Sequence, residues 1–174
     1  RAMKHLGKKI VVVGVSASGK STFGRILAQK TGLPLILMDS IMWKHGWNYI
    51  GDEATVRELN AISAKSEWII EGYISTNARA FVLERADAII YLDYSPWVSS
   101  WRYIKRWWTH REIPRPELPG SPDTFKLSFL SRVWSKAEVK ALEPLLHSVA
   151  NQAKIFTLRS PKAATALLSE IKVP

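Results

Sequence analysis

Five short apolar runs recur along the chain, and stretches with helical spacing separate them. The runs lie at residues 10–13, 33–38, 68–70, 88–92 and 154–158. Their length and their content of β-branched residues are typical of strands that are buried on both faces. Strands that alternate with helices predict a parallel sheet with right-handed crossovers and a helical layer on each side. The pattern therefore indicates a three-layer α/β fold with a five-stranded parallel sheet.

The segments between the first three runs predict a helix and an insertion. A helix is expected over residues 22–30, and Gly32 would end it because glycine readily takes the left-handed conformation found at helix C-termini. Residues 41–66 form an insertion after the second strand, and a helix is expected over 52–65. The full length, 1–174, suits one domain with one sizeable core.

A second and longer insertion, residues 96–150, separates the fourth and fifth strands. A helix is expected over 96–109 and a further helical region over about 125–149, bent at Pro144. Between them, residues 113–122 contain four prolines, which forbid a helix and favour an extended loop. Long loops in compact domains often cover active sites, so this insertion is predicted to carry a lid.

The first helix of this second insertion carries an apolar stripe. Its members have helical spacing and are Trp97, Trp101, Ile104 and Trp108. Tryptophans beside a basic residue, as in Trp107 and Trp108 after Arg106, also occur on helices that bind membrane surfaces or single strands. We favour a buried hinge at the base of the lid for this pair.

Composition and charge narrow the class of function only a little. The chain is 47% hydrophobic and 23% charged, carries a formal net charge of +10 and contains no cysteine. It therefore has no disulfide and no thiolate metal site. No apolar run approaches the about 20 residues that span a bilayer, so we expect a cytoplasmic protein without a membrane partner. The positive charge suits nucleotides or nucleic acid, and we favour nucleotides.

A phosphate-binding motif follows the first apolar run. The sequence GVSASGKST matches the pattern G-x-x-x-x-G-K-S/T at every fixed position. Its glycines let backbone N–H groups turn toward phosphate oxygens, and the next helix adds its positive dipole end. Lys20 would reach the β- and γ-phosphates, Ser21 would bind Mg²⁺, and Thr22 would reach the α-phosphate. The residues predicted to hold ATP here are Gly14, Ser16, Ala17, Ser18, Gly19, Lys20, Ser21 and Thr22. The motif predicts a P-loop NTPase.

Further polar residues stand at the carboxyl ends of predicted strands, where parallel sheets bind ligands. Asp39 follows the second strand, Glu71 the third and Arg159 the fifth. One carboxylate would orient Mg²⁺ through its water molecules, and the other would accept the proton of the acceptor's hydroxyl. Either assignment of Asp39 and Glu71 to these two roles fits the sequence. The structural alternative for each is a helix cap or a surface acid.

Arginines gather in the second insertion. Arg102 and Arg106 are one helical turn apart, so both would project from one helix face. Their forked guanidinium groups suit phosphate oxygens and would stabilise a transferring phosphoryl group. Arg111 and Arg115 lie beyond them and would reach the site when the lid closes. The alternative for all four is a solvated basic face that pairs with nearby glutamates.

Together, these motifs resemble the nucleoside-monophosphate-kinase-like branch of the P-loop kinases. Within that branch the chain is most similar to bacterial proteins described as adenylate-kinase-related or DNA topology modulation proteins. The matching segments are GVSASGKS (14–21), LMDSIMWKHGW (37–47), WIIEGY (68–73), RADAIIYLD (85–93), WRYIKR (101–106) and LRSP (158–161). They cover nearly the whole chain. The resemblance implies a small ATP-dependent phosphotransferase with a helical lid.

The resemblance also implies roles for individual residues. Arg102 and Arg106 match lid-helix arginines that contact phosphates, and Arg159 would border the adenine. Adenylate kinases place an arginine for the acceptor phosphate four residues past the acid that follows strand three. This chain has Ser75 there, so Arg79 is the nearest candidate for that role.

The second substrate stays open at this point. Trp43 and Trp47 would either stack on an acceptor's base or sugar, or pack the first insertion onto the sheet. The acceptor is nucleotide-like or a small hydroxylated metabolite. The alternative function is a nucleotide-binding regulator that acts on DNA topology without kinase activity. Monomer and homodimer fit the sequence equally well.

Overall fold

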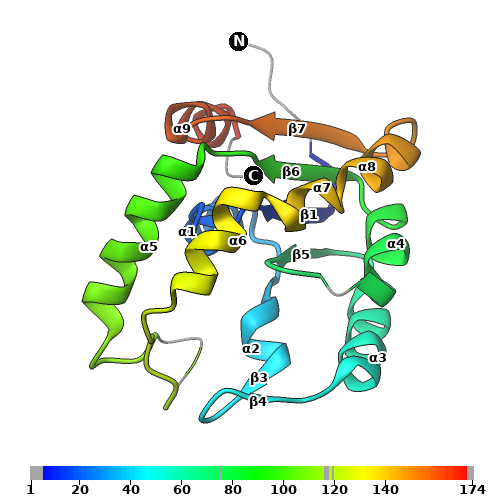
Figure 1. Ribbon diagram of the computed structural model, residues 1–174. Helices are drawn as coiled ribbons and strands as arrows, with labels where there is room; N and C mark the ends of the chain where they lie inside the picture. Colours follow the sequence, from blue (N-terminus) through cyan, green and yellow to red (C-terminus); the bar gives the residue numbers. More distant parts are fainter. Residues whose placement is uncertain (1–5, 75, 116–117, 119, 172–174) are drawn as a thin grey trace.

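A five-stranded parallel sheet forms the centre of the molecule (Figure 1). The computed structural model describes residues 6–74, 76–115, 118 and 120–171. The strands stand in the order β2-β5-β1-β6-β7. They are β1 (Lys9–Gly14), β2 (Leu35–Leu37), β5 (Trp68–Glu71), β6 (Ala88–Leu92) and β7 (Lys154–Leu158). The predicted α/β fold and its parallel sheet are confirmed.

The register of the sheet brings the carboxyl ends of the strands to one edge. Glu71 at the end of β5 pairs with Val12 of β1 on one side and Leu37 of β2 on the other. Gly14 at the end of β1 pairs with Leu92 at the end of β6. The segments that follow β1, β2 and β5 therefore start side by side, as expected for a ligand site in a parallel sheet.

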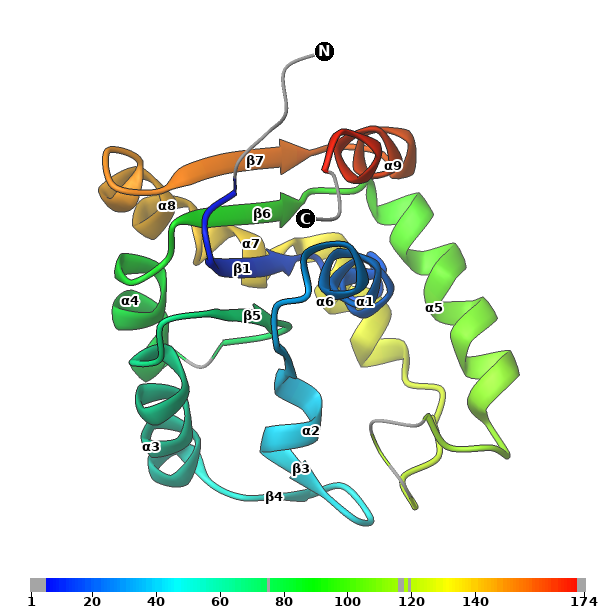
Figure 2. The same cartoon turned by 180° about the vertical axis from the view of Figure 1, so that it is seen from behind.

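Apolar clusters cover both faces of the sheet. Alternate residues of β1 enter opposite clusters, Ile10 and Val12 on one face and Val11 and Val13 on the other. The first face is covered by α1 (Lys20–Thr31) and α9 (Pro161–Glu170) (Figure 2). The second is covered by α3 (Asp52–Ser63), α4 (Thr76–Glu84) and α8 (Glu143–Val149). Burying each large aliphatic side chain here contributes roughly 1.5–3 kcal/mol to folding.

Helix ends in the first half of the chain follow the predicted signals closely. Helix α1 ends at Gly32, whose φ is 71° and whose N–H donates to the carbonyl of Ala28 at 2.8 Å. The first insertion contains α3, as expected. It also contains two features that the apolar pattern did not predict, the short helix α2 (Met38–Met42) and a hairpin of β3 (Trp43–Lys44) and β4 (Asn48–Tyr49).

The second insertion departs from the prediction in its second half. One bent helix was expected over 125–149, but α6 (Leu127–Ser135), α7 (Ala137–Lys140) and α8 stand there instead. Lys136 breaks the helix because its φ is 50°, in the left-handed region. Pro144 lies in the first turn of α8, where a missing N–H costs nothing, so it starts a helix and does not bend one.

The aromatic stripe of α5 (Pro96–His110) faces outward, which corrects a second expectation. Trp97, Trp101 and Trp108 are 74%, 68% and 64% exposed, so Trp108 does not form a buried hinge. The opposite face of α5 packs inward because Tyr103 stacks on Phe129 of α6, with ring centroids 4.2 Å apart. In the described part of the chain, no helix is both long and apolar enough to cross a bilayer.

Candidate functional site

The phosphate loop lies between β1 and α1 with a backbone that alternates in handedness. Gly14, Ala17 and Gly19 have φ values of 152°, 61° and 90°. Such alternation forms concave nests of N–H groups that bind anions. Lys20 Nζ reaches back across the loop and donates to the carbonyl oxygens of Gly14 at 3.1 Å and Val15 at 2.9 Å. The loop and its lysine thus have the conformation and the charge that a triphosphate requires.

Gly14 has no room for a side chain, which gives a first prediction. A Cβ there would meet the carbonyl oxygen of Leu92 well inside contact distance, on a positive φ. We expect Gly14→Ala to lower the free energy of unfolding by about 3 kcal/mol, measured by urea unfolding. Gly32→Ala is the matched control, since its φ is also positive but nothing lies within 4 Å, and about 1 kcal/mol is expected. Equal losses would contradict the steric argument.

Arg102 of α5 lies on the phosphate loop. Its Nη1 donates to the carbonyl of Ser18 at 2.7 Å, and the same nitrogen fills the space where a Cβ of Gly19 would stand. The guanidinium also lies 5.4 Å from the ring centroid of Tyr94, which steadies it from the other side. Its predicted contact with a phosphate stays a prediction, but the structure places its charge at the loop.

Arg106 contacts a different part of the molecule, one turn further along α5. Its Nε forms an ion pair with Asp123 Oδ2 at 3.3 Å, and its guanidinium lies over the rings of Tyr103 and Phe129. Burial lowers the pKa of Arg106, the nearby charge of Arg115 lowers it further, and Asp123 opposes both effects. Among the described contacts, therefore, only the first of the two helix arginines reaches the phosphate loop.

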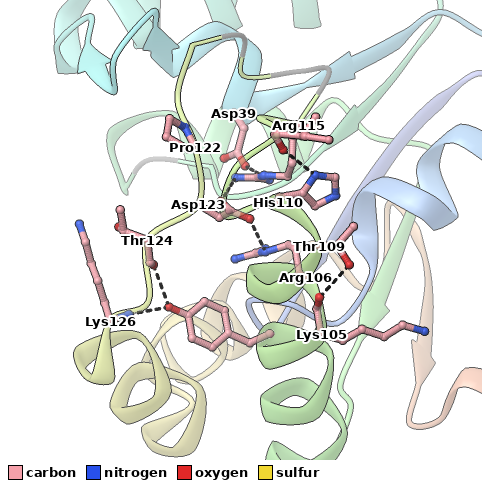
Figure 3. A network of polar contacts seen from close by, with 12 residues as sticks. Asp39, Lys105, Arg106, Thr109, His110, Arg115, Pro122, Asp123, Thr124 and Lys126 are labelled. Atoms are coloured by element: carbon pink, nitrogen blue, oxygen red, sulfur yellow. Dashed lines mark hydrogen bonds and ion pairs between the residues drawn. The ribbon is translucent and has the colours of Figure 1, made fainter.

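A network of four charged residues, here called the ion network, joins α2, α5 and the lid loop (residues 111–126) (Figure 3). Arg115 Nη1 lies 3.3 Å from Asp39 Oδ2, and Arg115 Nη2 lies 3.4 Å from Asp123 Oδ1. The ion pair between Asp123 and Arg106 completes it. The side chains of Arg115 and Asp123 are 10% and 7% exposed, whereas that of Asp39 is 42% exposed. The lid arginine thus contacts the carboxylate that the sequence proposed as a base.

Glu71 is buried at the end of β5, on the side of α1. It is 4% exposed, and a Cβ on Gly24 of α1 would lie 3.3 Å from its Cγ. Gly24 comes three residues after Ser21 on the same helix, so the side chain of Glu71 lies along the first turns of α1. The two carboxylates therefore face different neighbours, because Glu71 contacts α1 and Asp39 contacts the lid loop.

The hairpin of β3 and β4 packs against the lid loop. Trp47 donates from its backbone N–H to Ser121 Oγ at 3.1 Å and from Nε1 to the carbonyl of Pro122 at 3.2 Å. Trp43 contacts Trp47 edge to face, with ring centroids 5.6 Å apart. Trp43 also packs against the apolar cluster that contains Val11 and Val13 of β1. Trp47 therefore packs on the lid loop, and the predicted stacking of these tryptophans on an acceptor stays a prediction.

Arg79 of α4 is buried near the carboxyl ends of β1 and β5. It is 5% exposed, and its Nε donates to the carbonyl of Ile74 at 3.2 Å. It lines a narrow cavity that also touches Gly14 and Gly72, at the carboxyl ends of β1 and β5. Ser75, the position that the resemblance to adenylate kinases singled out, lies outside the described residues.

Two predicted arginines stay away from the ion network. Arg111 stacks on Trp108, 3.9 Å from the ring centroid, and pairs with Glu112 at 3.5 Å on the surface. Its predicted contact with the site on lid closure stays a prediction. Arg159 follows β7 and is exposed, and the neighbouring Ser160 caps α9 by accepting from Ala163 N–H at 3.2 Å.

The described residues contain no group of three or more His, Asp or Glu side chains that could hold a metal ion by themselves. A Mg²⁺ that arrives with a triphosphate fits the residues present, because Ser21 stands at the start of α1 and Glu71 lies along that helix. Ser21 would bind it directly, and Glu71 would hold its water molecules.

Sequence reasoning missed Asp123 and Ser121. Both lie in the proline-rich loop and its continuation, at no fixed spacing from the residues that they contact. Asp123 is one of the few buried carboxylates among the described residues, and Ser121 is 1% exposed. Burial of an acid in a loop depends on tertiary contacts, so the local sequence carries little signal for it.

No family model matches the sequence, and no curated protein sequence matches it. Solved structures do match. A gluconokinase from Sinorhizobium meliloti has a TM-score of 0.55 at 21% identity, over 97% of this chain and 95% of that one. A shikimate kinase from Acinetobacter baumannii, in complex with shikimate, has a TM-score of 0.59 at 21% identity, over 95% and 90%.

A sugar kinase from a Janibacter species has a TM-score of 0.52 at 19% identity, over 94% of this chain and 91% of that one. The comparisons give no support to the narrower resemblance to adenylate-kinase-related or DNA topology modulation proteins. At these identities the likeness is one of fold. The chain has the α/β fold of the P-loop kinases.

Proposed function

We propose that the protein is an ATP-dependent kinase that moves the γ-phosphoryl group of Mg-ATP to a hydroxyl of a small acceptor. The observation that carries this proposal is the meeting of the phosphate loop with Lys20, the carboxylate Asp39 and the loop-bound Arg102 at one sheet edge. Phosphoryl transfer needs positioning, positive charge around the phosphates and a group that accepts the hydroxyl proton. The kinases that share the fold support the same reaction class.

The two carboxylates take different roles in this proposal. Glu71 lies along α1 and is buried, which favours orienting the water molecules of Mg²⁺ beside Ser21. Asp39 is partly exposed and faces the lid loop, which favours contact with the acceptor. As the acceptor oxygen attacks the γ-phosphorus, its proton passes to the Asp39 carboxylate, the bond from phosphorus to the leaving ADP oxygen breaks, and ADP departs.

For the acceptor we propose a small hydroxylated metabolite with an anionic group. Arg79 supplies buried positive charge at the carboxyl ends of β1 and β5, where a carboxylate or phosphate would be held, whereas Arg115 is already paired with Asp39 and Asp123. The indole of Trp47 is bound to the lid loop through Pro122, which supports a packing role for this ring. The names of the structural neighbours, a gluconokinase and a shikimate kinase, favour hydroxylated acids over nucleotides.

The experiment that tests this function measures ADP release from Mg-ATP against a panel of acceptors. The panel contains hydroxylated acids, sugars, nucleosides, nucleoside monophosphates and DNA, and Lys20→Ala serves as the control. Release that depends on one hydroxylated acid and on Lys20 supports the proposal. Slow release that no acceptor stimulates, or that DNA alone stimulates, would overturn it and favour a nucleotide-binding regulator.

A further inference from the structure

We propose that Asp123 is a positioning residue for phosphoryl transfer, which holds Arg106 and Arg115 side by side and through Arg115 sets the orientation of Asp39. This inference rests on the kinase function proposed above. It concerns a residue with no motif and no predicted role, whose carboxylate nevertheless lies at the centre of the ion network (Figure 3).

The geometry of Asp123 divides its two oxygens between two arginines. Oδ1 lies 3.4 Å from Arg115 Nη2, and Oδ2 lies 3.3 Å from Arg106 Nε. Its backbone N–H donates to the carbonyl of His110 at 3.1 Å, which fastens this part of the lid loop to the end of α5. One residue therefore links the helix, the loop and both guanidinium groups.

Electrostatics explain why a carboxylate is needed at this position. The guanidinium groups of Arg115, which is buried, and Arg106, which is partly buried, repel each other, and a charge removed from water is tolerated when it is paired. Without Asp123, Arg115 would lose the carboxylate contact at its Nη2 and would keep the one to Asp39 at its Nη1. With Asp123 present, Arg115 is shared, and it contacts Asp39 through Oδ2 at 3.3 Å. Among the described contacts Oδ1 of Asp39 has no ion-pair partner, so it can receive a proton.

Asp123 also couples this arrangement to the position of the lid loop. The preceding residues Ser121 and Pro122 are hydrogen-bonded to Trp47 of the hairpin. When the loop is seated on the hairpin, the carboxylate stands between the two arginines. The negative charge of Asp123 therefore lies between the two arginines while the loop contacts the hairpin. If the loop moved away, both guanidinium groups would lose this charge.

The test compares Asp123→Asn, which keeps the size and removes the charge, with Asp123→Glu, which keeps the charge. We expect Asp123→Asn to lower kcat by about 10²-fold, because the arginines lose their alignment, while the Kd for Mg-ATP changes by less than about threefold. Asp123→Glu should recover kcat to within about tenfold of the wild type. Asp93→Asn is the matched control, since it breaks the ion pair of Asp93 with Lys136 at 2.7 Å and leaves the network intact.

Each result of this comparison either supports or overturns the positioning role of Asp123. Kinetics of Asp123→Asn that equal those of Asp93→Asn would overturn it, as would a parallel loss of Mg-ATP binding. If the wild type transfers no phosphoryl group to any acceptor, the proposed function fails. The contact between Asp123 and Arg115 is then tested by the midpoints of urea unfolding. Asp123→Asn, Arg115→Gln and the double variant would then show a non-additive loss if Asp123 holds the arginine, whereas additive losses would overturn that role.

Discussion

Replacing Lys20 by alanine is expected to lower kcat for phosphoryl transfer by on the order of 10³-fold while the protein stays folded. The ammonium group is the positive charge inside the phosphate loop, within hydrogen-bonding distance of the carbonyls of Gly14 and Val15. Its loss removes a charge aimed at the phosphates, where negative charge is redistributed in the transition state. The measurement is acceptor-dependent ADP release under saturating Mg-ATP.

Lys30→Ala provides the control for this result, because Lys30 lies in the last turn of the same helix, away from the loop. It should leave kcat and KM within about twofold of the wild type. Unfolding curves of both variants would separate loss of chemistry from loss of structure. A decrease below about tenfold in Lys20→Ala would contradict the assignment of this lysine to the transferred group.

Replacing Asp39 by asparagine should lower kcat by about 10³-fold, because the side chain can no longer accept the acceptor's proton. Asparagine keeps the size of the side chain and can still accept a hydrogen bond from Arg115, which lies 3.3 Å from Oδ2. Binding of Mg-ATP should therefore persist in this variant. Single-turnover measurements with the acceptor found in the panel would isolate the chemical step.

Two further variants serve as comparisons for Asp39→Asn. Asp52→Asn removes a carboxylate from the insertion that follows Asp39, on the surface at the start of α3, and should leave kcat unchanged. Glu71→Gln should raise the Mg²⁺ concentration needed for half-maximal rate, because Glu71 is assigned to the water molecules of the ion. A larger loss of kcat in Glu71→Gln than in Asp39→Asn would exchange the two roles.

The sequence predicted well those elements whose conformation depends on residues that are close together in the chain. An apolar run such as 88–92 has few alternatives to a buried strand, and Gly32 ends α1 by its own backbone preference. The phosphate loop is likewise one continuous segment. Each of these signals lies within a few residues of the structure it specifies.

The features that the sequence did not predict depend on distant contacts. Asp39 and Arg115 are 76 residues apart, and the ion network needs both of them to be brought to Asp123 by the fold. The break at Lys136 goes with an ion pair to Asp93 at the end of β6, which no helical spacing reveals. The stripe on α5 has the spacing of a core-facing helix, yet Tyr103 on the other face packs against α6 instead.

The contact between Trp47 and the lid loop has a consequence for how the two substrates bind. A continuous set of contacts runs from the hairpin through Ser121 and Asp123 to α5, whose Arg102 lies on the phosphate loop. In the proposed kinase, an acceptor that contacts the hairpin and a nucleotide that contacts Arg102 would both act on this one set of contacts. Such coupling is reciprocal, so each substrate would then change the affinity for the other by the same factor.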